Sequence, residues 1–381
     1  MSGVPKLSRR ARWAVPAGAL VVTGAVMAGS LITVAQAAPV LPSRTPAQLL
    51  AAVGQDQGPA LYGSVLETAS LGLPSLPGTS SPTSITSLLT GSHTVKVWYA
   101  GPEHYRLALL ASLSETDVVR SGSTAWLWQS TTNSVTEISV PAAKSKPEPM
   151  PAPALTPQQA ASQVLAAVGP TTAVNVASNV VVAGQAAYEL VLAPKDSRSL
   201  VGQVRIAVDG HNGVPLRVQV FARGALASPA ISVGFSSITF ATPAAADTSF
   251  TPPAGAKITK ENLGQQSTPG GKQAGTGITT IGSGWLAVLE LPSSALTTGS
   301  PGPGPVSANG TSGESAAALR ALIGSATVEH GAWGTGRLLH TSLISVLMTD
   351  SGSTFAGAVQ PSVLYAAASK AATAPRPATT P

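Results

Sequence analysis

The chain has few side chains that could do catalytic chemistry, and their spacing matches no known catalytic pattern. It lacks the zinc-protease pattern H-E-x-x-H and the hydrolase pattern G-x-S-x-G. Gly282, Gly284 and Ala287 match the dinucleotide pattern G-x-G-x-x-A, but the required strand, helix and acidic residue do not surround them. Cysteine is absent, which excludes thiolate nucleophiles, thiolate metal sites and disulfides. The five histidines are dispersed, without the spacing of metal ligands: His93, His104, His211, His330 and His340.

We therefore expect no catalytic residue, no metal site and no cofactor. An acidic pair assembled only by the fold stays an alternative, and with it an envelope hydrolase. A nucleic-acid partner is not expected either, because the basic residues beyond position 40 do not form a cluster.

Large apolar side chains on predicted strands are the second chemical feature. Trp126 and Trp128 lie two residues apart, so they share one face of a strand, and alternate residues of the runs 93–100 and 104–111 can join them. One interpretation is a core beneath helices. The other is an incompletely covered apolar surface that accepts an acyl chain. The predicted ligand-binding set is Val97, Tyr99, Tyr105, Leu107, Leu109, Trp126 and Trp128.

The N-terminal segment has the features of an export signal. Four basic residues precede a stretch from Trp13 to Val34 that has no charge, and Ala35-Gln36-Ala37 then matches a signal-peptidase site. The apolar stretch is long enough to span a bilayer, so cleavage and retention as a membrane anchor are both open. Because these four charges belong to the net charge of +6, the rest of the chain carries only about +2. We expect an exported protein, secreted or anchored to the cytoplasmic membrane.

Two helices and many short strands are expected to hold the apolar set in place. The segments 45–53 and 156–168 both begin with Thr-Pro, which suits a helix N-cap followed by the first helical position. An apolar stripe on the second helix is formed by Val164, Leu165 and Val168. The strand runs alternate, which predicts an antiparallel sheet with one buried and one solvated face. Ile238 and Phe240 fall out of this alternation, which indicates a bulge.

Composition shifts divide the chain further. We expect a signal peptide or anchor at 1–37, a main domain at 38–260, a linker at 261–277, a small C-terminal α+β domain at 278–368 and a disordered tail at 369–381. A helix is expected at 314–323 within the small domain.

Three motifs and the order of elements resemble the LolA-like and RseB/MucB-like superfamily of extracytoplasmic proteins. The resemblance covers about residues 44–260. Its motifs are Gly101-Pro102-Glu103-His104-Tyr105-Arg106, the strand Ser121-Gly122-Ser123-Thr124-Ala125-Trp126-Leu127-Trp128, and the closing segment Phe250-Thr251-Pro252-Pro253-Ala254-Gly255-Ala256. Ser121 replaces the usual Asp, and the C-terminal domain lies outside a minimal carrier.

The resemblance implies an α+β fold, in which an unclosed antiparallel half-barrel is wrapped on helices. It also implies an apolar cavity for acyl chains of lipids or lipoproteins at a membrane surface. Arg106 matches an arginine that ties down the helical lid in lipoprotein carriers. The second function that the resemblance implies is an envelope-stress sensor that binds a membrane anti-sigma factor.

Overall fold

The structure is a computed structural model that describes residues 40–54, 58–72, 90–111, 113–140, 156–166, 168–262, 279–292 and 324–373. The chain divides into two compact units, Met1–Ala37 and Ala38–Pro381, and all described residues belong to the second. The predicted signal or anchor segment, the proline-rich segment 141–153, the helix at 314–323 and most of the linker lie outside the described residues.

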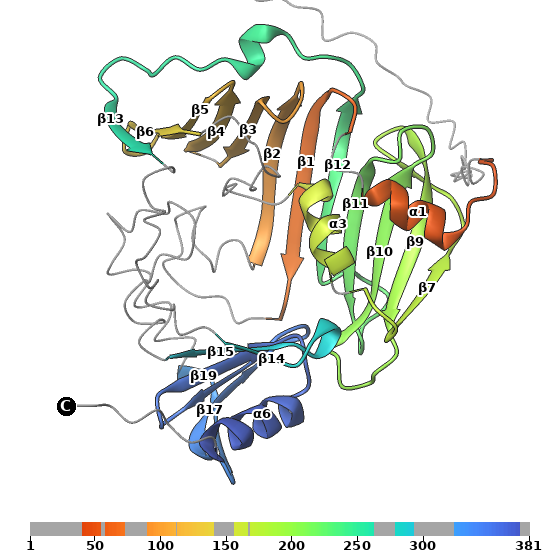
Figure 1. The fold of residues 1–381 in the computed structure, drawn as a ribbon, viewed down its shortest axis with the longest axis vertical. Helices are drawn as coiled ribbons and strands as arrows, with labels where there is room; N and C mark the ends of the chain where they lie inside the picture. Colours follow the sequence, from red (N-terminus) through yellow and green to blue (C-terminus); the bar gives the residue numbers. More distant parts are fainter. Residues whose placement is uncertain are drawn as a thin grey trace, which may run out of the picture. The chain divides into compact units, whose positions relative to one another are not determined.

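The larger part of the described chain is an open sheet of thirteen strands, so the expected α+β class with an unclosed antiparallel sheet is confirmed (Figure 1). The strand order is β13-β6-β5-β4-β3-β2-β1-β12-β11-β10-β9-β7, and β8 also pairs with β9. All pairs are antiparallel except β13 with β6. The strands are β1 (Leu61–Ser70), β2 (Thr90–Tyr99), β3 (His104–Leu110), β4 (Glu115–Ser121), β5 (Thr124–Gln129), β6 (Ser134–Ser139), β7 (Thr172–Val176), β8 (Val180–Val182), β9 (Gln185–Pro194), β10 (Val201–Asp209), β11 (Pro215–Ala222), β12 (Ile231–Thr239) and β13 (Lys257–Asn262).

The two helices begin where the Thr-Pro pairs predicted. Helix α1 (Pro46–Val53) has Thr45 as its N-cap, in a capping box with Gln48. Helix α3 (Pro157–Ala166) repeats the arrangement, because the Gln159 amide donates to the Thr156 hydroxyl and the Thr156 amide donates to the Gln159 side chain. These side chains satisfy backbone groups that the first helical turn leaves unpaired.

The helices pack on one side of the sheet, which we call the helix face. Helix α3 packs against β11 and β12, and α1 packs against α3 and β7 (Figure 1). The buried residues of α3 are Pro157, Ala160 and Ala161, whereas Val164 and Leu165 of the predicted stripe are only partly buried. Val164, Leu165 and Val168 still pack against the main core, so the predicted stripe is present, and Ala160 and Ala161 lie deeper in that core.

The predicted bulge is present on β12. Ser64 of β1 pairs with Ser237, but the next residue, Val65, pairs with Phe235, so Ser236 has no opposite residue. The extra residue shifts Ile238 by one position relative to the preceding strand, which explains the break in the sequence alternation.

A second sheet has six strands in the order β14-β15-β19-β18-β17-β16, with helix α6 (Pro361–Thr373) packed on β18 and β19. Its core includes Trp333, Leu347, Phe355 and Leu364. Helix α6 was not predicted and continues past residue 368, where we expected the tail to begin. The strands are β14 (Thr279–Ile281), β15 (Val288–Pro292), β16 (Thr327–Gly331), β17 (Gly334–His340), β18 (Ser345–Thr349) and β19 (Ser353–Gly357).

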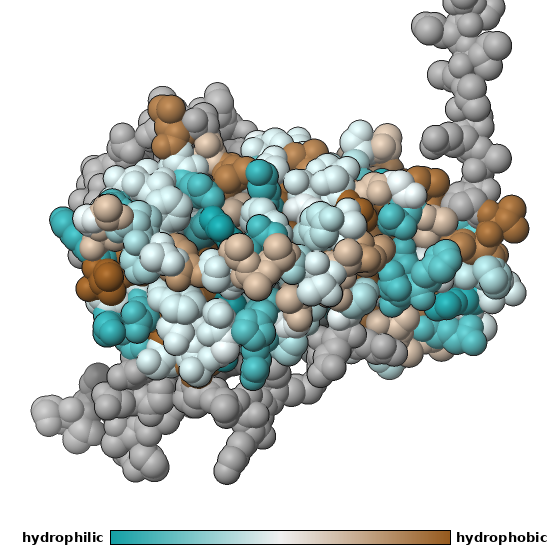
Figure 2. Space-filling view, turned by 90° about the horizontal axis from the view of Figure 1, so that it is seen from above, coloured by the Kyte–Doolittle hydropathy of each residue, from teal (hydrophilic) through white to brown (hydrophobic). Residues whose placement is uncertain are grey.

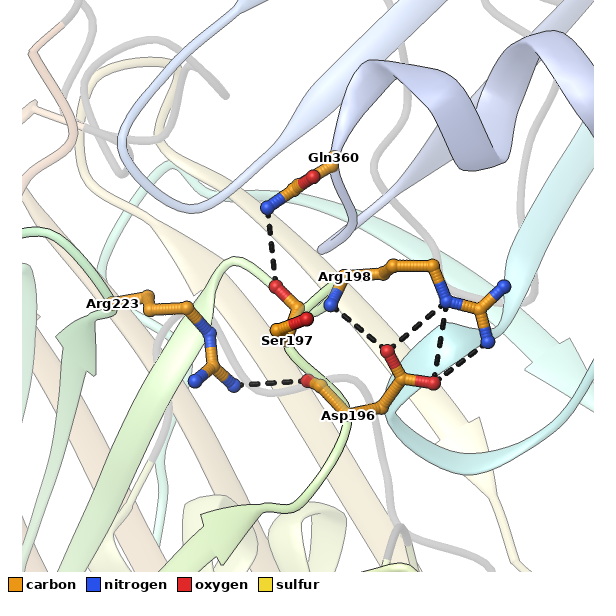
Figure 3. Close-up of polar contacts among 5 residues, drawn as sticks. All are labelled: Asp196, Ser197, Arg198, Arg223 and Gln360. Carbon is orange, nitrogen blue, oxygen red and sulfur yellow. Dashed lines mark hydrogen bonds and ion pairs between the residues drawn. The ribbon is translucent and has the colours of Figure 1, made fainter.

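Backbone hydrogen bonds join the second sheet to the loop between β9 and β10. The Leu200 amide donates to Ala358 and the Gln360 amide donates to Arg198, at 2.9 and 2.8 Å. The Gln360 side chain donates to the Ser197 carbonyl at 3.1 Å (Figure 3). The two sheets are therefore in direct contact at this loop.

Among the described residues, none of the helices has the length and apolar character needed to cross a membrane.

Candidate functional site

Five of the seven predicted ligand-binding residues lie together on the helix face of β2 and β3. Strand pairing places Val97 opposite Leu107 and Tyr99 opposite Tyr105, with Leu109 in the same row of alternate positions. Val97, Leu107 and Leu109 are buried and belong to the main core, and both tyrosines pack against it. The shared face that the alternation predicted for these five residues is therefore present.

Trp126 and Trp128 lie on the opposite face, so our prediction that all seven residues share one surface is wrong. Val119 pairs with Trp126 and with Arg106, and Asp117 pairs with Trp128. The hairpin registers fix this arrangement, because paired residues in antiparallel strands point to the same side. The sequence alternation gives the two sides of each strand, but it does not say how neighbouring hairpins are aligned.

A connecting segment explains why large apolar residues occur on this second side. We call residues 241–256 the strap and the side that they cross the strap face. The strap contains the short 3₁₀ helix η1 (Ala245–Thr248), which packs on β2, β3 and β4. The Phe250 ring lies 5.9 Å from that of Trp126, and Asn133 before β6 donates to the Ala254 carbonyl. Strands β3, β4 and β6 thus have buried residues on both faces, and both tryptophans of β5 are partly buried on the strap face. The expected solvated face is wrong for this half of the sheet.

Arg106 belongs to a charged cluster on the strap face. Its Nη2 donates to the Asp117 carboxylate at 2.5 Å and lies 3.6 Å from the Glu115 carboxylate. The guanidinium also lies over the Trp98 ring, 5.5 Å from its centre. The described contacts of Arg106 are all with side chains of the sheet, so they do not test its role as a lid tether. The tether role stays a prediction.

Burial dominates the electrostatics of this cluster. The Asp117 side chain has no exposed surface. Burial raises the pKa of Asp117 from 3.8 to about 7, while the Arg106 charge opposes the rise and the Glu115 charge adds to it. Asp117 Oδ1, Arg106 Nε and Trp128 Nε1 are buried and have no hydrogen-bond partner among the described residues.

The helix face contains a functional candidate that our sequence reasoning missed. Arg120 pairs with Tyr105 on β3 and with Ala125 on β5, so it lies in the same row as Tyr99. It is 7% exposed, and its Nε is buried without a hydrogen-bond partner in the described part of the chain. The sequence did contain a signal for this residue. Arg120 follows Val118 by two residues and so lies on the same, apolar face of β4, where a charged side chain is unusual.

Clusters of three or more potential metal ligands are absent from the described part of the chain. A small apolar hollow of about 200 Å³ lies in the second sheet, between α6 and β14–β15, with Lys370 at its edge. On the side of the molecule seen in Figure 2, described apolar residues form separate spots among polar ones.

No protein-family model matches the sequence, and no curated protein matches it. Solved structures are similar at low identity. MucB in the MucA/MucB complex of Pseudomonas aeruginosa is 14% identical, over 84% of this chain and 95% of that chain, with a TM-score of 0.40. An uncharacterised conserved protein from Thermus thermophilus is 10% identical, over 57% of this chain and 100% of that chain, with a TM-score of 0.33.

A LolA superfamily protein from Nitrosomonas europaea is 10% identical, over 55% of this chain and 99% of that chain, with a TM-score of 0.21. These similarities are at low identity and low TM-score, and the fold described above comes from this chain's own open antiparallel sheet with few helices.

Proposed function

We propose that this protein binds the acyl chains of lipids or lipoproteins on the helix face of β2–β5, outside the cytoplasmic membrane, and catalyses no reaction. One observation carries the proposal: the helices pack on one half of the apolar helix face, and the apolar row continues into the other half. Helices α1 and α3 pack mainly on β7, β11 and β12, whereas the apolar row continues across β2, β3, β4 and β5.

The chemistry of this part of the helix face suits an acyl chain. Val97, Leu107 and Leu109 continue into Val118 and Leu127 by direct strand pairing. Burying a methylene group of a ligand against such residues is favourable by about 0.8 kcal/mol. The acids of β2–β6 all lie on the strap face, as the pairing of Glu115, Asp117 and Glu137 requires.

Leu127→Glu tests the proposal, with Leu66→Glu as the matched control. Leu127 is partly buried on the helix face, so a carboxylate there puts a charge beside the bound acyl chain. Leu66 is 41% exposed and lies on the other side of the sheet, opposite Thr94. We expect native mass spectrometry of the full chain purified from the cell envelope to show bound lipid in the wild type and in Leu66→Glu, with a loss of about tenfold or more in Leu127→Glu.

A wild-type protein that purifies without lipid, and takes up none from mixed vesicles, would contradict acyl binding. The alternative function is an envelope-stress sensor that binds a membrane anti-sigma factor. Recovery of such a regulator with a lipid-free wild type would favour that alternative, and MucB, with its complex with MucA, gives the precedent.

A further inference from the structure

Arg120 is a buried positive charge without a described counter-charge. Arg120 is 7% exposed, it forms no ion pair with the described residues, and its Nε is buried without a hydrogen-bond partner among them. Buried guanidinium groups in proteins are normally paired, because removing the charge from water is unfavourable. An unpaired arginine in this position indicates that a partner outside the described residues completes the site.

The strand registers exclude the nearest acids as that partner. Glu115, Asp117 and Glu137 of the neighbouring strands lie on the strap face, on the other side of the sheet. Glu67 does lie on the helix face, but it pairs with His93 at the opposite end of β2 from Tyr99. The helix face of β2–β6 therefore has no described carboxylate beside Arg120.

Two hydroxyl groups accompany the guanidinium. Tyr99 and Tyr105 occupy the same row as Arg120. Burial raises the pKa of both tyrosines, so at neutral pH their hydroxyls keep the proton and can donate hydrogen bonds. The Arg120 charge acts on Tyr105, since it opposes the rise in the pKa of that residue. A planar guanidinium with neighbouring donors suits a carboxylate or a phosphate.

The apolar residues of β2 and β3 on the helix face show along which strands the acyl chain of the ligand would lie. Leu107 and Leu109 follow Tyr105 along β3 on the same face, and Val97 and Val95 lie beside them on β2. The four residue steps from Tyr105 to Leu109 span about 14 Å. A ligand with its acidic head at Arg120 would extend its acyl chain along this row.

We propose that Arg120 binds the acidic head group of the acyl ligand, so that the helix face selects acyl carboxylates or phosphates over uncharged compounds of the same chain length. The inference rests on the proposed acyl binding and adds the chemical class of the head group.

The test compares three twelve-carbon probes on the delipidated full chain: dodecanoate, dodecyl phosphate and dodecanol. We expect at least one anion to bind the wild type about tenfold or more tightly than the alcohol, because hydrogen bonds between charged groups are the strong ones. A preference for dodecanoate indicates a free fatty acid, and one for dodecyl phosphate indicates a phospholipid.

Arg120→Met should remove this preference and leave the affinity for dodecanol within about twofold, since the apolar row is unchanged. Arg120→Lys should keep part of the preference, because it retains the charge but loses the planar donors. Arg205→Met is the control for the loss of one positive charge, since Arg205 pairs with Glu189 on the opposite face of β10. It should bind all three probes as the wild type does.

The melting temperature of ligand-free Arg120→Met provides a second readout. Because the substitution removes an unpaired buried charge, the melting temperature of the variant should be equal to or above that of the wild type. A clear fall would show that Arg120 has a partner within the protein and would overturn the inference. Equal binding of all three probes by the wild type would overturn the head-group preference alone. Binding of none would contradict the proposed acyl binding as well.

Discussion

Arg106 and Arg120 lie on neighbouring strands, but their surroundings are opposite. Arg106 faces the strap and shares its charge with Asp117 and Glu115. Arg120 faces the helices, where no described acid balances it. A single sheet thus separates a structural charge cluster from the arginine that we propose as the head-group site.

Asp117 makes the stability of the protein dependent on pH. The pKa of Asp117 is raised from 3.8 to about 7 in the folded protein. Between these two pH values, Asp117 therefore carries a proton in the folded protein but has lost it in the unfolded chain. Stability should therefore be highest at acidic pH and fall as the pH rises from about 4 to about 7, with no further change from this group above that range. Asp117→Asn should flatten this fall, as measured by urea unfolding at several pH values.

Glu115→Gln is the companion variant for this measurement. The Glu115 charge is one of the causes that raise the pKa of Asp117, so its removal should shift the fall in stability to lower pH. A wild-type stability that stays level or rises between pH 4 and pH 7 would contradict the assignment, since it would mean that Arg106 keeps Asp117 ionised in the folded protein.

At the scale of elements, the bulge where β1 meets β12 depends on a residue without a side chain. A Cβ atom at Gly63 would lie 2.1 Å from the Ser237 carbonyl oxygen, which is backbone and cannot move aside alone. The bulge itself is held by side chains, because Ser236 donates to the Ser64 carbonyl and the Ser64 amide donates to Ser237. The chain therefore approaches closely at the pair of strands that joins the two halves of the large sheet.

Gly63→Ala should lower the free energy of unfolding by about 1–3 kcal/mol, the usual range for an overpacked position. Chemical denaturation followed by circular dichroism measures this. Gly224→Ala is the control, because its added Cβ meets no atom within 4 Å. Similar stabilities for the two variants would contradict the prediction. They would mean that β1 and β12 move apart enough to accept a methyl group at residue 63 and still stay paired.

The elements that the sequence predicted are those with a local signal. Both Thr-Pro helix starts, the alternating strands and the bulge before Ile238 were visible in short stretches of sequence. Strand β13 and helix α6 were missed. The first is a polar edge strand whose parallel pairing with β6 joins distant segments. The second has five alanines among its thirteen residues, which weakens its apolar period.

The candidate site was only half predictable for the same reason. Alternation correctly grouped Tyr105, Leu107 and Leu109, because these residues belong to one strand. The face of Trp126 depends on two hairpin registers and on Phe250, which lies more than a hundred residues later. No local pattern contains that information.

At the scale of the whole molecule, the contact between the two sheets depends on the loop 195–200. The Arg223 side chain fixes this loop, because it donates to the carbonyls of Ser199, Asp196, Pro194 and Val201 at 2.8–3.3 Å. The loop in turn offers the Ser197 carbonyl to the Gln360 side chain (Figure 3). It also offers the Arg198 carbonyl to the Gln360 backbone amide. Trp285 adds a further contact, since its Nε1 donates to the Thr172 hydroxyl of β7 at 2.8 Å.

Arg223→Ala should loosen this contact and let the second sheet unfold before the large one. The variant leaves several carbonyls of the loop without their charged donor, and hydrogen bonds to charged groups contribute about 1.5–3 kcal/mol. Arg198→Ala is the matched control in the same loop, because the Arg198 side chain is 56% exposed and its described ion pair is with Asp196 at the surface. Calorimetry of the full chain should show an early, separate transition for Arg223→Ala and a wild-type profile for Arg198→Ala. If both variants melt as the wild type does, the two sheets are held together by their apolar contacts at Leu343 and Ala358 and not by the loop.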